Sequence, residues 1–533
     1  MFVEYLKFNF TMPVSKEQYR VEQEAFVSNH GGTTPHDVFF SLLPTICSIV
    51  MTTSTMEVLK KYIHIHENIK VVIQFVLIII PTILCYTILS EYIISACLIL
   101  TLICTLNLSL MIERKINYSD LNTELVKDKI SCITNFRALT NIITAVCILA
   151  VDFRIFPRKF AKTETYGHSL MDTGVGMFIL ANALVAPETR DFSTSRQICF
   201  LSTLIRNMNN SFRSCISLLI LGFGRFTAVE YLGYQKHVTE YGVHWNFFLT
   251  LAIVKLLTSM ITSAINTKYS LFSGIWILCM HEYTMSIKDL KSWVLRDEPR
   301  VDFFSANREG LISIPGYVGL YFIGVAIGRL IHSTYQTLYT NSNLDFNTKL
   351  SWFKYTELYE PLCLLYIKLI KISALSFLTI VYCDFKVSRK LANFGYCMWI
   401  VSLTTALLSI LVFIEFMLGL TNIFHISYSN DIKIEFKLNV NTNLRMNLKK
   451  HVKSEKLENI RVIFGKPLEI FDAVNYNGLF FFLVSNIMTG IVNMSMYTLY
   501  AKQSVALSIL IIYMAVNVIS VLILYRLKIR IKL

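Results

Sequence analysis

The chain has 533 residues, of which 54% are hydrophobic and only 16% are charged, and its mean hydropathy is +0.51. These values exclude an ordinary soluble enzyme, because a soluble protein of this length would carry far more charge. The net charge of +14 does not indicate a nucleic-acid partner. Lys and Arg lie mainly between apolar segments, where they set topology and meet anionic lipid headgroups. The expected partner is therefore the lipid bilayer.

Apolar segments long enough to cross a hydrocarbon core about 30 Å thick recur along the chain. They predict an all-α polytopic membrane protein with about thirteen transmembrane helices in one bundle, which encloses a cavity for a lipid or an acyl chain. The expected spans are 36–54, 70–88, 91–112, 139–153, 170–187, 214–229, 246–265, 269–287, 310–334, 360–383, 394–424, 476–500 and 503–525.

Composition divides the chain into four parts. Residues 1–35 are a polar N-terminal segment without a signal-peptide pattern, so we expect insertion through spans that are kept. Residues 36–424 form the transmembrane bundle with its polar links. Residues 425–475 are a polar loop, and residues 476–533 are a final transmembrane hairpin with a basic tail. Most of the 12 cysteines lie in or beside apolar spans, which is typical of small core residues.

The distribution of Lys and Arg predicts an orientation. Both are more frequent in the loops after odd-numbered spans and in the C-terminal tail. The positive-inside rule places that side, with the loop 425–475, in the cytosol and the N-terminus on the opposite side. The links 154–169, 230–245 and 288–309 then share one membrane face, where their polar residues can converge on one site.

The link that follows the fourth span crowds four basic and two acidic side chains and a histidine between two apolar segments, and it reads DFRIFPRKFAKTETYGHS. Asp152 ends an apolar helix, where partial desolvation raises the pKa of a carboxyl group and makes it a better base. Pro157 should break the helix, so that Lys162 can turn back toward Asp152. The two residues are either a catalytic base with its positioning cation or a structural ion pair at a helix end.

Further residues of this link are candidates for substrate binding, each with a structural alternative. Arg158 and Lys159, with Arg154 nearby, suit a phosphate group, but they can also snorkel to the membrane interface. His168 and Asp172 are four residues apart at the start of the next helix. They can share a face of that helix in a site, or they can cap and support it.

A second polar motif, GYQKHVTEYGVHWNFF (233–248), repeats His237, Glu240, Tyr241 and His244 at helical spacing and contains Asn246. The two histidines are seven residues apart, about 10 Å along a helix, which is too far for one metal ion. No metal is therefore expected. The motif is either a polar wall that recognises a sugar or inositol or a structural hydrogen-bond network.

Polar residues that we expect to be buried also occur at the start and in the middle of later spans. Asn307 and Arg308 precede a long apolar helix, where they suit an N-cap and an anionic headgroup, respectively. Asn486 and Asn493 lie seven apart in FFFLVSNIMTGIVN. Amides in such positions often join neighbouring helices, so helix packing is favoured over substrate contact.

These motifs together resemble the inositol acyltransferases of GPI-anchor biosynthesis, the PIG-W type. The likeness covers nearly the whole chain in the family's order: EAFVSNHGGTT (24–34), VDFRIFPRKFAKTETYGHSLMDTGVG (151–176), GYQKHVTEYGVHWNFFLT (233–250), NREGLISIPGY (307–317), RKLANFGYCMWI (389–400) and FFFLVSNIMTGIVN (480–493). One departure is mild, since Lys159 stands where an arginine is common.

The resemblance implies a multi-pass enzyme of the endoplasmic reticulum. Such enzymes move a fatty acyl group, usually palmitoyl, from acyl-CoA to the inositol 2-hydroxyl of glucosaminyl-phosphatidylinositol. The family's acid and lysine fall on Asp152 and Lys162, which would act as general base and as positioning or oxyanion-stabilising cation. Acyl-CoA would be a co-substrate and not a permanently bound cofactor, and no obligate protein partner is implied.

The polar residues in and beside the three links are the candidates for substrate binding, from the chemistry of their side chains, although His168 falls at a position that varies in the family. These candidates are Arg154, Arg158, Lys159, His168, Asp172, His237, Glu240, His244, Asn246, Asn307 and Arg308. Two other classes remain as alternatives: a lipid transporter, which also uses charge within the membrane, and a non-catalytic assembly subunit, which would need neither Asp152 nor Lys162.

The charge distribution predicts a luminal N-terminus and a cytosolic C-terminus. In sealed microsomes, an N-terminal tag should be protected from added protease and a C-terminal tag should be digested. The sequon at Asn9 should accept a glycan, whereas the sequon at Asn117 should not. Digestion of the N-terminal tag in intact vesicles would overturn this orientation.

Overall fold

The computed structural model describes residues 16–28, 30–112, 130–190, 200–232, 238–287, 289–296, 299–342, 352–436 and 468–531. Every regular element in these ranges is a helix, and the only strand-like pairing among them is an isolated bridge between Thr33 and His168. The predicted all-α class is therefore confirmed.

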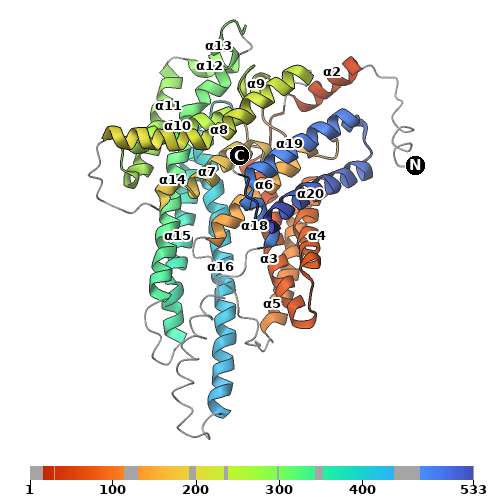
Figure 1. Ribbon diagram of the computed structural model, residues 1–533, viewed down its shortest axis with the longest axis vertical. Coiled ribbons are helices and arrows are strands. Elements are labelled where there is room, and N and C mark those ends of the chain that lie inside the picture. Colours follow the sequence, from red (N-terminus) through yellow and green to blue (C-terminus); the bar gives the residue numbers. More distant parts are fainter. Residues whose placement is uncertain are drawn as a thin grey trace.

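The N-terminal third forms a group of helices that runs along one side of the molecule (Figure 1). It consists of α2 (Lys16–Val27), α3 (Pro35–Tyr62), α4 (Glu67–Tyr86) and α5 (Ile93–Ile112), and α6 (Ser131–Ala150) follows. α4 and α5 both pack on α3. α3 begins where it does because the Thr34 side chain accepts a hydrogen bond from the Asp37 backbone N–H and Pro35 starts the helix with its φ already fixed.

The middle of the chain is organised around α14, which packs against α7, α10, α11 and α15. Its elements are η2 (Arg158–Phe160), α7 (Leu170–Leu184), η3 (Pro187–Thr189), α8 (Phe200–Leu232), α9 (Val238–Tyr241), α10 (Phe247–Ala264), η4 (Thr267–Tyr269), α11 (Ser270–Ile287), α12 (Leu290–Leu295), α13 (Phe303–Ala306) and α14 (Arg308–Ser342). Small residues allow the close packing, because a Cβ added at Gly274 of α11 would lie 2.9 Å from the Gly319 carbonyl oxygen of α14.

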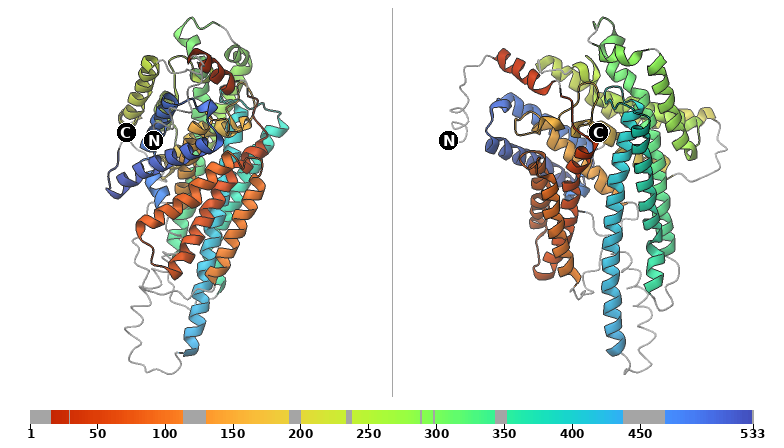
Figure 2. Two further views of the ribbon diagram at one scale, coloured as in Figure 1. Left: turned by 90° about the vertical axis from the view of Figure 1, so that its right-hand side faces the viewer. Right: turned by 180° about the vertical axis from the view of Figure 1, so that it is seen from behind.

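The C-terminal part contains α15 (Trp352–Tyr382), α16 (Phe394–Phe436), α18 (Glu469–Tyr476), α19 (Gly478–Ser495), η6 (Thr498–Tyr500) and α20 (Gln503–Arg526). α15 and α16 run side by side and extend away from the tilted helices α8, α10, α19 and α20 (Figures 1 and 2). α16 continues to Phe436 and α18 begins at Glu469, so helices extend into both ends of the range 425–475, whose assignment as a polar loop stays a prediction. A helix ends where its backbone hydrogen bonding ends, which need not coincide with the end of an apolar run.

Nine helices in the described part of the chain are long and apolar enough to cross a membrane. They are Pro35–Leu59, Glu67–Tyr86, Ser131–Ala150, Phe247–Ala264, Arg308–Leu338, Glu360–Tyr382, Phe394–Met417, Gly478–Ser495 and Gln503–Arg526; two shorter apolar helices cover Ile93–Asn107 and Leu170–Leu184. The protein is thus a multi-pass membrane protein. The count of about thirteen, and one bundle around one cavity, stay predictions. Asn9 and Asn117 lie outside the described residues.

Candidate active site

A cavity of about 200 Å³ lies between α6, α7, α8, α9, α10, α19 and the loop that precedes α16. Most of its wall is apolar and includes Ile143, Cys147, Ile148, Val151, Leu170, Val175, Met177, Phe178, Phe247 and Phe482. A polar part of the wall is formed by Lys162, Arg225, Glu240, Tyr241 and Arg389. Such a wall suits a ligand with a hydrocarbon portion and a charged headgroup.

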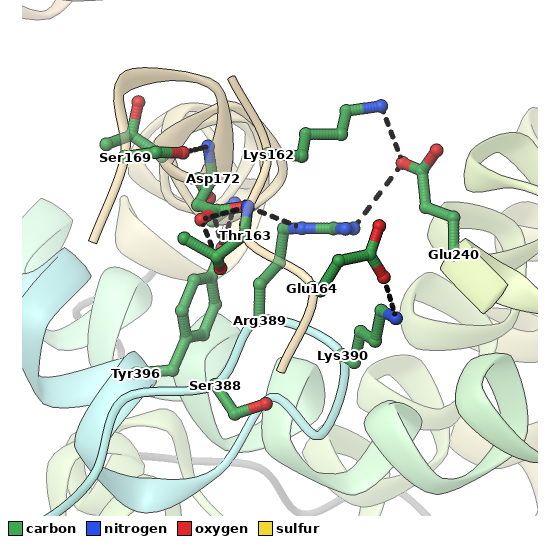
Figure 3. Close-up of polar contacts among 12 residues, drawn as sticks. Lys162, Thr163, Glu164, Ser169, Asp172, Glu240, Ser388, Arg389, Lys390 and Tyr396 are labelled. Atoms are coloured by element: carbon green, nitrogen blue, oxygen red, sulfur yellow. Dashed lines mark hydrogen bonds and ion pairs between the residues drawn. The ribbon is translucent and has the colours of Figure 1, made fainter. Parts of the chain in front are cut away.

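The polar part is organised around the Glu240 carboxylate, which accepts from two cations (Figure 3). Lys162 Nζ lies 2.8 Å from Glu240 Oε1, and the Arg389 guanidinium approaches the same oxygen at 3.4 Å. Burial alone would raise the pKa of Glu240, but the charges of Lys162 and Arg389 and the hydrogen bond from Lys162 lower it to about 2. Glu240 is therefore ionised at neutral pH and fixes Lys162 at the cavity wall.

Asp172 belongs to the same network through its contact with Arg389, and its side chain is almost fully buried. Its Oδ1 accepts from Arg389 Nε at 2.8 Å, and its Oδ2 accepts from the hydroxyl and backbone N–H of Thr163 at 2.7 and 3.2 Å (Figure 3). The Ser169 hydroxyl caps α7 by accepting from the Asp172 N–H at 3.1 Å. Both carboxylate oxygens thus have protein donors, which supports the structural alternative for Asp172, and its substrate contact stays a prediction.

Asp152 follows directly after the end of α6 and receives a hydrogen bond from an asparagine of α19. Asn493 Nδ2 donates to Asp152 Oδ2 over 2.8 Å. Burial raises the pKa of Asp152 to about 6, although the Asn493 hydrogen bond and the charges of Arg158 and Lys162 act in the opposite direction. Asp152 is not among the cavity-lining residues, whereas its neighbour Val151 is, and the direct ion-pair partner of Lys162 is Glu240.

The basic residues of the link 154–169 have protein partners. Arg158 donates to the backbone carbonyls of Val151, Phe153 and Phe156 at 2.9 to 3.2 Å, which satisfies acceptors at the C-terminal end of α6. Its guanidinium also lies over the Phe26 ring at 3.9 Å, and burial lowers its pKa to about 10. Arg158 therefore terminates α6, and the expected role in phosphate binding is not supported by its contacts.

Lys159 and Arg154 point to other groups as well. Lys159 Nζ pairs with Glu91 at 2.8 Å, and the exposed Arg154 side chain lies over the Tyr500 ring at 5.8 Å. Neither residue lines the cavity. The prediction of an anion site from Arg154, Arg158 and Lys159 was based on their spacing alone, which does not reveal tertiary partners.

His168 connects the link 154–169 to the N-terminal segment through a backbone hydrogen bond. Its carbonyl oxygen accepts from the Thr33 N–H at 2.7 Å, and its ring packs edge-on against Trp399 at 4.9 Å. Gly32, at φ 78°, is required here, because a Cβ would lie 2.3 Å from the His168 carbonyl oxygen. Burial lowers the pKa of the His168 imidazole, so it is neutral at pH 7. His168 thus fixes the link in place and does not line the cavity.

The remaining candidates have structural contacts. Asn246 caps α10 and donates to the Gly222 carbonyl at 2.8 Å. Asn307 Oδ1 accepts from the His244 N–H at 2.8 Å, and the His244 ring lies between Phe226 and Phe303. Arg308 is buried, donates to the Arg296 carbonyl and approaches Glu309 at 3.6 Å. Their predicted substrate roles gain no support from these contacts, and His237 lies outside the described residues.

Three residues of the site region were missed or misjudged from sequence. Arg389 is part of the motif 389–400, but nothing in the motif reveals that it reaches both Asp172 and Glu240. Asn493 was expected to join neighbouring helices, and it does link α19 to the end of α6, but its partner Asp152 could not be foreseen. Arg225 had a clear signal, because it is a charge inside the apolar span expected at 214–229, and such charges mark functional sites.

The fold and the site define a polytopic membrane protein with a buried charge network beside an apolar cavity. The GWT1 family model matches residues 19–524, so the chain belongs to the GWT1 family. It is similar to the glucosaminyl-phosphatidylinositol-acyltransferase PIGW of Bos taurus, with 33% identity over 94% of this chain and 97% of the relative. The human protein of the same name is 30% identical over 94% of this chain and 97% of the relative.

A fungal relative, the GPI-anchored wall transfer protein 1 of Saccharomyces cerevisiae, is 33% identical over 75% of this chain and 74% of its own length. These relatives confirm the resemblance seen in the sequence motifs. The chain is accordingly an acyltransferase.

The buried pairing of Asp172 with Arg389 predicts a loss of stability on its removal. Asp172→Asn should lower the free energy of unfolding by about 3 kcal/mol, because it leaves a buried guanidinium with one carboxylate fewer. The thermal unfolding midpoint of the purified protein measures this loss. Asp384→Asn is the control, since Asp384 is exposed and asparagine tolerates its positive φ. An unchanged midpoint in Asp172→Asn would contradict the structural role and favour the predicted substrate contact of Asp172.

Proposed function

We propose that the chain transfers a fatty acyl group, palmitoyl in particular, from acyl-CoA to the inositol 2-hydroxyl of glucosaminyl-phosphatidylinositol. The observation that carries this proposal is the Lys162 amine, held by Glu240 in a cavity that also has an extensive apolar wall, near a carboxyl group whose pKa is raised to about 6. The names of the bovine and human relatives supply the acceptor lipid.

The proposed chemistry assigns the base role to Asp152. A carboxylate with a pKa near 6 is ionised at neutral pH, yet it is more basic than an ordinary aspartate. It accepts the proton of the inositol hydroxyl while that oxygen forms a bond to the thioester carbonyl carbon. The carbon–sulfur bond then breaks, and the CoA thiolate leaves and takes up the proton.

Lys162 is proposed to stabilise the negative charge on the carbonyl oxygen in the transition state. Glu240 holds the Lys162 amine at 2.8 Å, so its position is set before substrate binds. A fixed cation of this kind stabilises developing charge without reorganisation during the reaction. The hydrogen bond from Asn493 and the charges of Arg158 and Lys162 all oppose the upward pKa shift of Asp152.

Transfer is proposed to be direct, without an acyl-enzyme intermediate. Cys147 lines the cavity, but no basic side chain in the described residues forms a hydrogen bond with its thiol. Cys147→Ala should therefore keep its turnover. The apolar wall would hold the acyl chain, at about 0.8 kcal/mol for each buried methylene group.

The proposal includes the cellular setting implied by the family. The protein would lie in the endoplasmic reticulum membrane with its N-terminus luminal and its C-terminus cytosolic. Acyl-CoA would be a co-substrate and would leave as free CoA after each turnover. No obligate protein partner is required by the proposed reaction.

The proposed dyad predicts the effect of two substitutions. Asp152→Asn removes the base, and Lys162→Ala removes the cation, so each should lower turnover by roughly 100-fold or more. Acyl transfer per mole of folded, acyl-CoA-bound protein is the measurement. Acyl-CoA binding should persist, because the apolar wall supplies most of the donor affinity. Normal turnover in Asp152→Asn would exclude this mechanism and leave the family membership intact.

The hydrogen bond from Asn493 predicts a pH effect. The rate should rise with pH through the pKa of Asp152, about 6, because only the ionised carboxylate is a base. Asn493→Leu removes a donor that stabilises the carboxylate, so the acidic limb of the kcat/KM profile should move to higher pH. Ser495→Ala is the control, since Ser495 bonds only to Val492 of its own helix. A limb that stays in place would show that Asp152 is not the titrating base.

A further inference from the structure

We propose that Arg225 binds a phosphate group of one of the two substrates at the polar part of the cavity. The inference rests on the proposed function, because glucosaminyl-phosphatidylinositol and acyl-CoA both carry phosphate. Arg225 lies on α8, its side chain is exposed, and it lines the cavity together with Lys162, Glu240 and Arg389.

Other basic residues near the cavity are already engaged. Arg389 is held by Asp172 at 2.8 Å and by Glu240 at 3.4 Å, and Lys162 is held by Glu240 at 2.8 Å. Arg158 does not line the cavity, and its Nη2 donates to the carbonyl groups of Val151 and Phe153. A phosphate group that enters the cavity therefore needs a different cation.

Arg225 meets that need. Its guanidinium forms no hydrogen bond or ion pair with any residue in the part of the chain that the structure describes, although its charge still lowers the pKa of Glu240. The polar part of the cavity contains three cations, Lys162, Arg225 and Arg389, against the carboxylates of Glu240 and Asp172. The excess positive charge is located on Arg225.

The sequence around Arg225 supports a ligand role. It lies in the apolar run LILGFGRF, and a charge in such a run is costly unless it has a partner. The preceding Gly224 has open space where a side chain would be, so the approach to Arg225 along the helix is unobstructed. The planar guanidinium can bind two phosphate oxygens at once, which a lysine cannot do.

The test compares Arg225→Gln, Arg225→Lys and Arg213→Gln in the purified full-length protein. Arg213 is the matched control, because it is an exposed arginine on the same helix that does not line the cavity. Arg225→Gln should raise the KM of one substrate about tenfold or more, with kcat within about threefold of wild type, the scale of one charge-assisted contact. Arg225→Lys should recover part of the affinity, and Arg213→Gln should match wild type.

Two arms identify which phosphate is bound. A raised KM for glucosaminyl-phosphatidylinositol at saturating acyl-CoA assigns the lipid phosphate. A raised KM for acyl-CoA, but not for an acyl-pantetheine thioester that lacks the nucleotide phosphates, assigns the coenzyme. Unchanged KM values for both substrates, with a normal unfolding midpoint, would overturn the proposal and leave the transfer reaction standing.

A direct binding measurement separates this inference from the proposed function. Equilibrium binding of radiolabelled acyl-CoA and of glucosaminyl-phosphatidylinositol to protein in nanodiscs does not depend on turnover. If wild type shows no transfer, the proposed function fails. Even then, weaker binding of either ligand by Arg225→Gln than by Arg213→Gln would support the phosphate contact, and equal binding would exclude it.

Discussion

The site depends on one buried guanidinium. Arg389 contacts Asp172 at the start of α7 and Glu240 in α9, and so joins three segments that are distant in the sequence. In a low-dielectric interior, a charge of this kind is stable only with its partners, and removal of one partner is strongly destabilising. The position of Lys162 follows from this arrangement, because the carboxylate that holds Lys162 is also held by Arg389.

The charged residues near the cavity differ in how many of their polar atoms already have protein partners. Both carboxylate oxygens of Asp172 and the Nε and Nη2 atoms of Arg158 contact protein groups, so these residues shape the link between α6 and α7. Nη1 of Arg158 is buried and has no hydrogen-bond partner among the described residues. Asp152 has a single hydrogen bond from Asn493 to one carboxylate oxygen, and Arg225 faces the cavity. Residues of the same charge type in one short segment can therefore have bracing or chemical roles, and only the partners distinguish them.

Much of the class and part of the site could be predicted from sequence, because hydropathy and local motifs are properties of neighbouring residues. The desolvation of Asp152 at the end of an apolar helix was predicted, and its pKa is raised accordingly. The pairing of Lys162 with Glu240 could not be predicted, because it depends on how the helices pack. The same reason applies to the contacts of Arg158 with the carbonyl groups of Val151, Phe153 and Phe156.

The wide separation of these partners in the sequence has a consequence for how the protein is made. Asp172 is synthesised 217 residues before Arg389, and Asp152 is synthesised 341 residues before Asn493. At ~5–20 residues per second, the ribosome needs roughly 10–40 s to reach Arg389 after Asp172. During that time the segment around α7 is in the membrane with an uncompensated carboxylate. Assembly of the site is therefore a late event in biogenesis, and a nascent chain that stalls before the loop preceding α16 is a substrate for quality control.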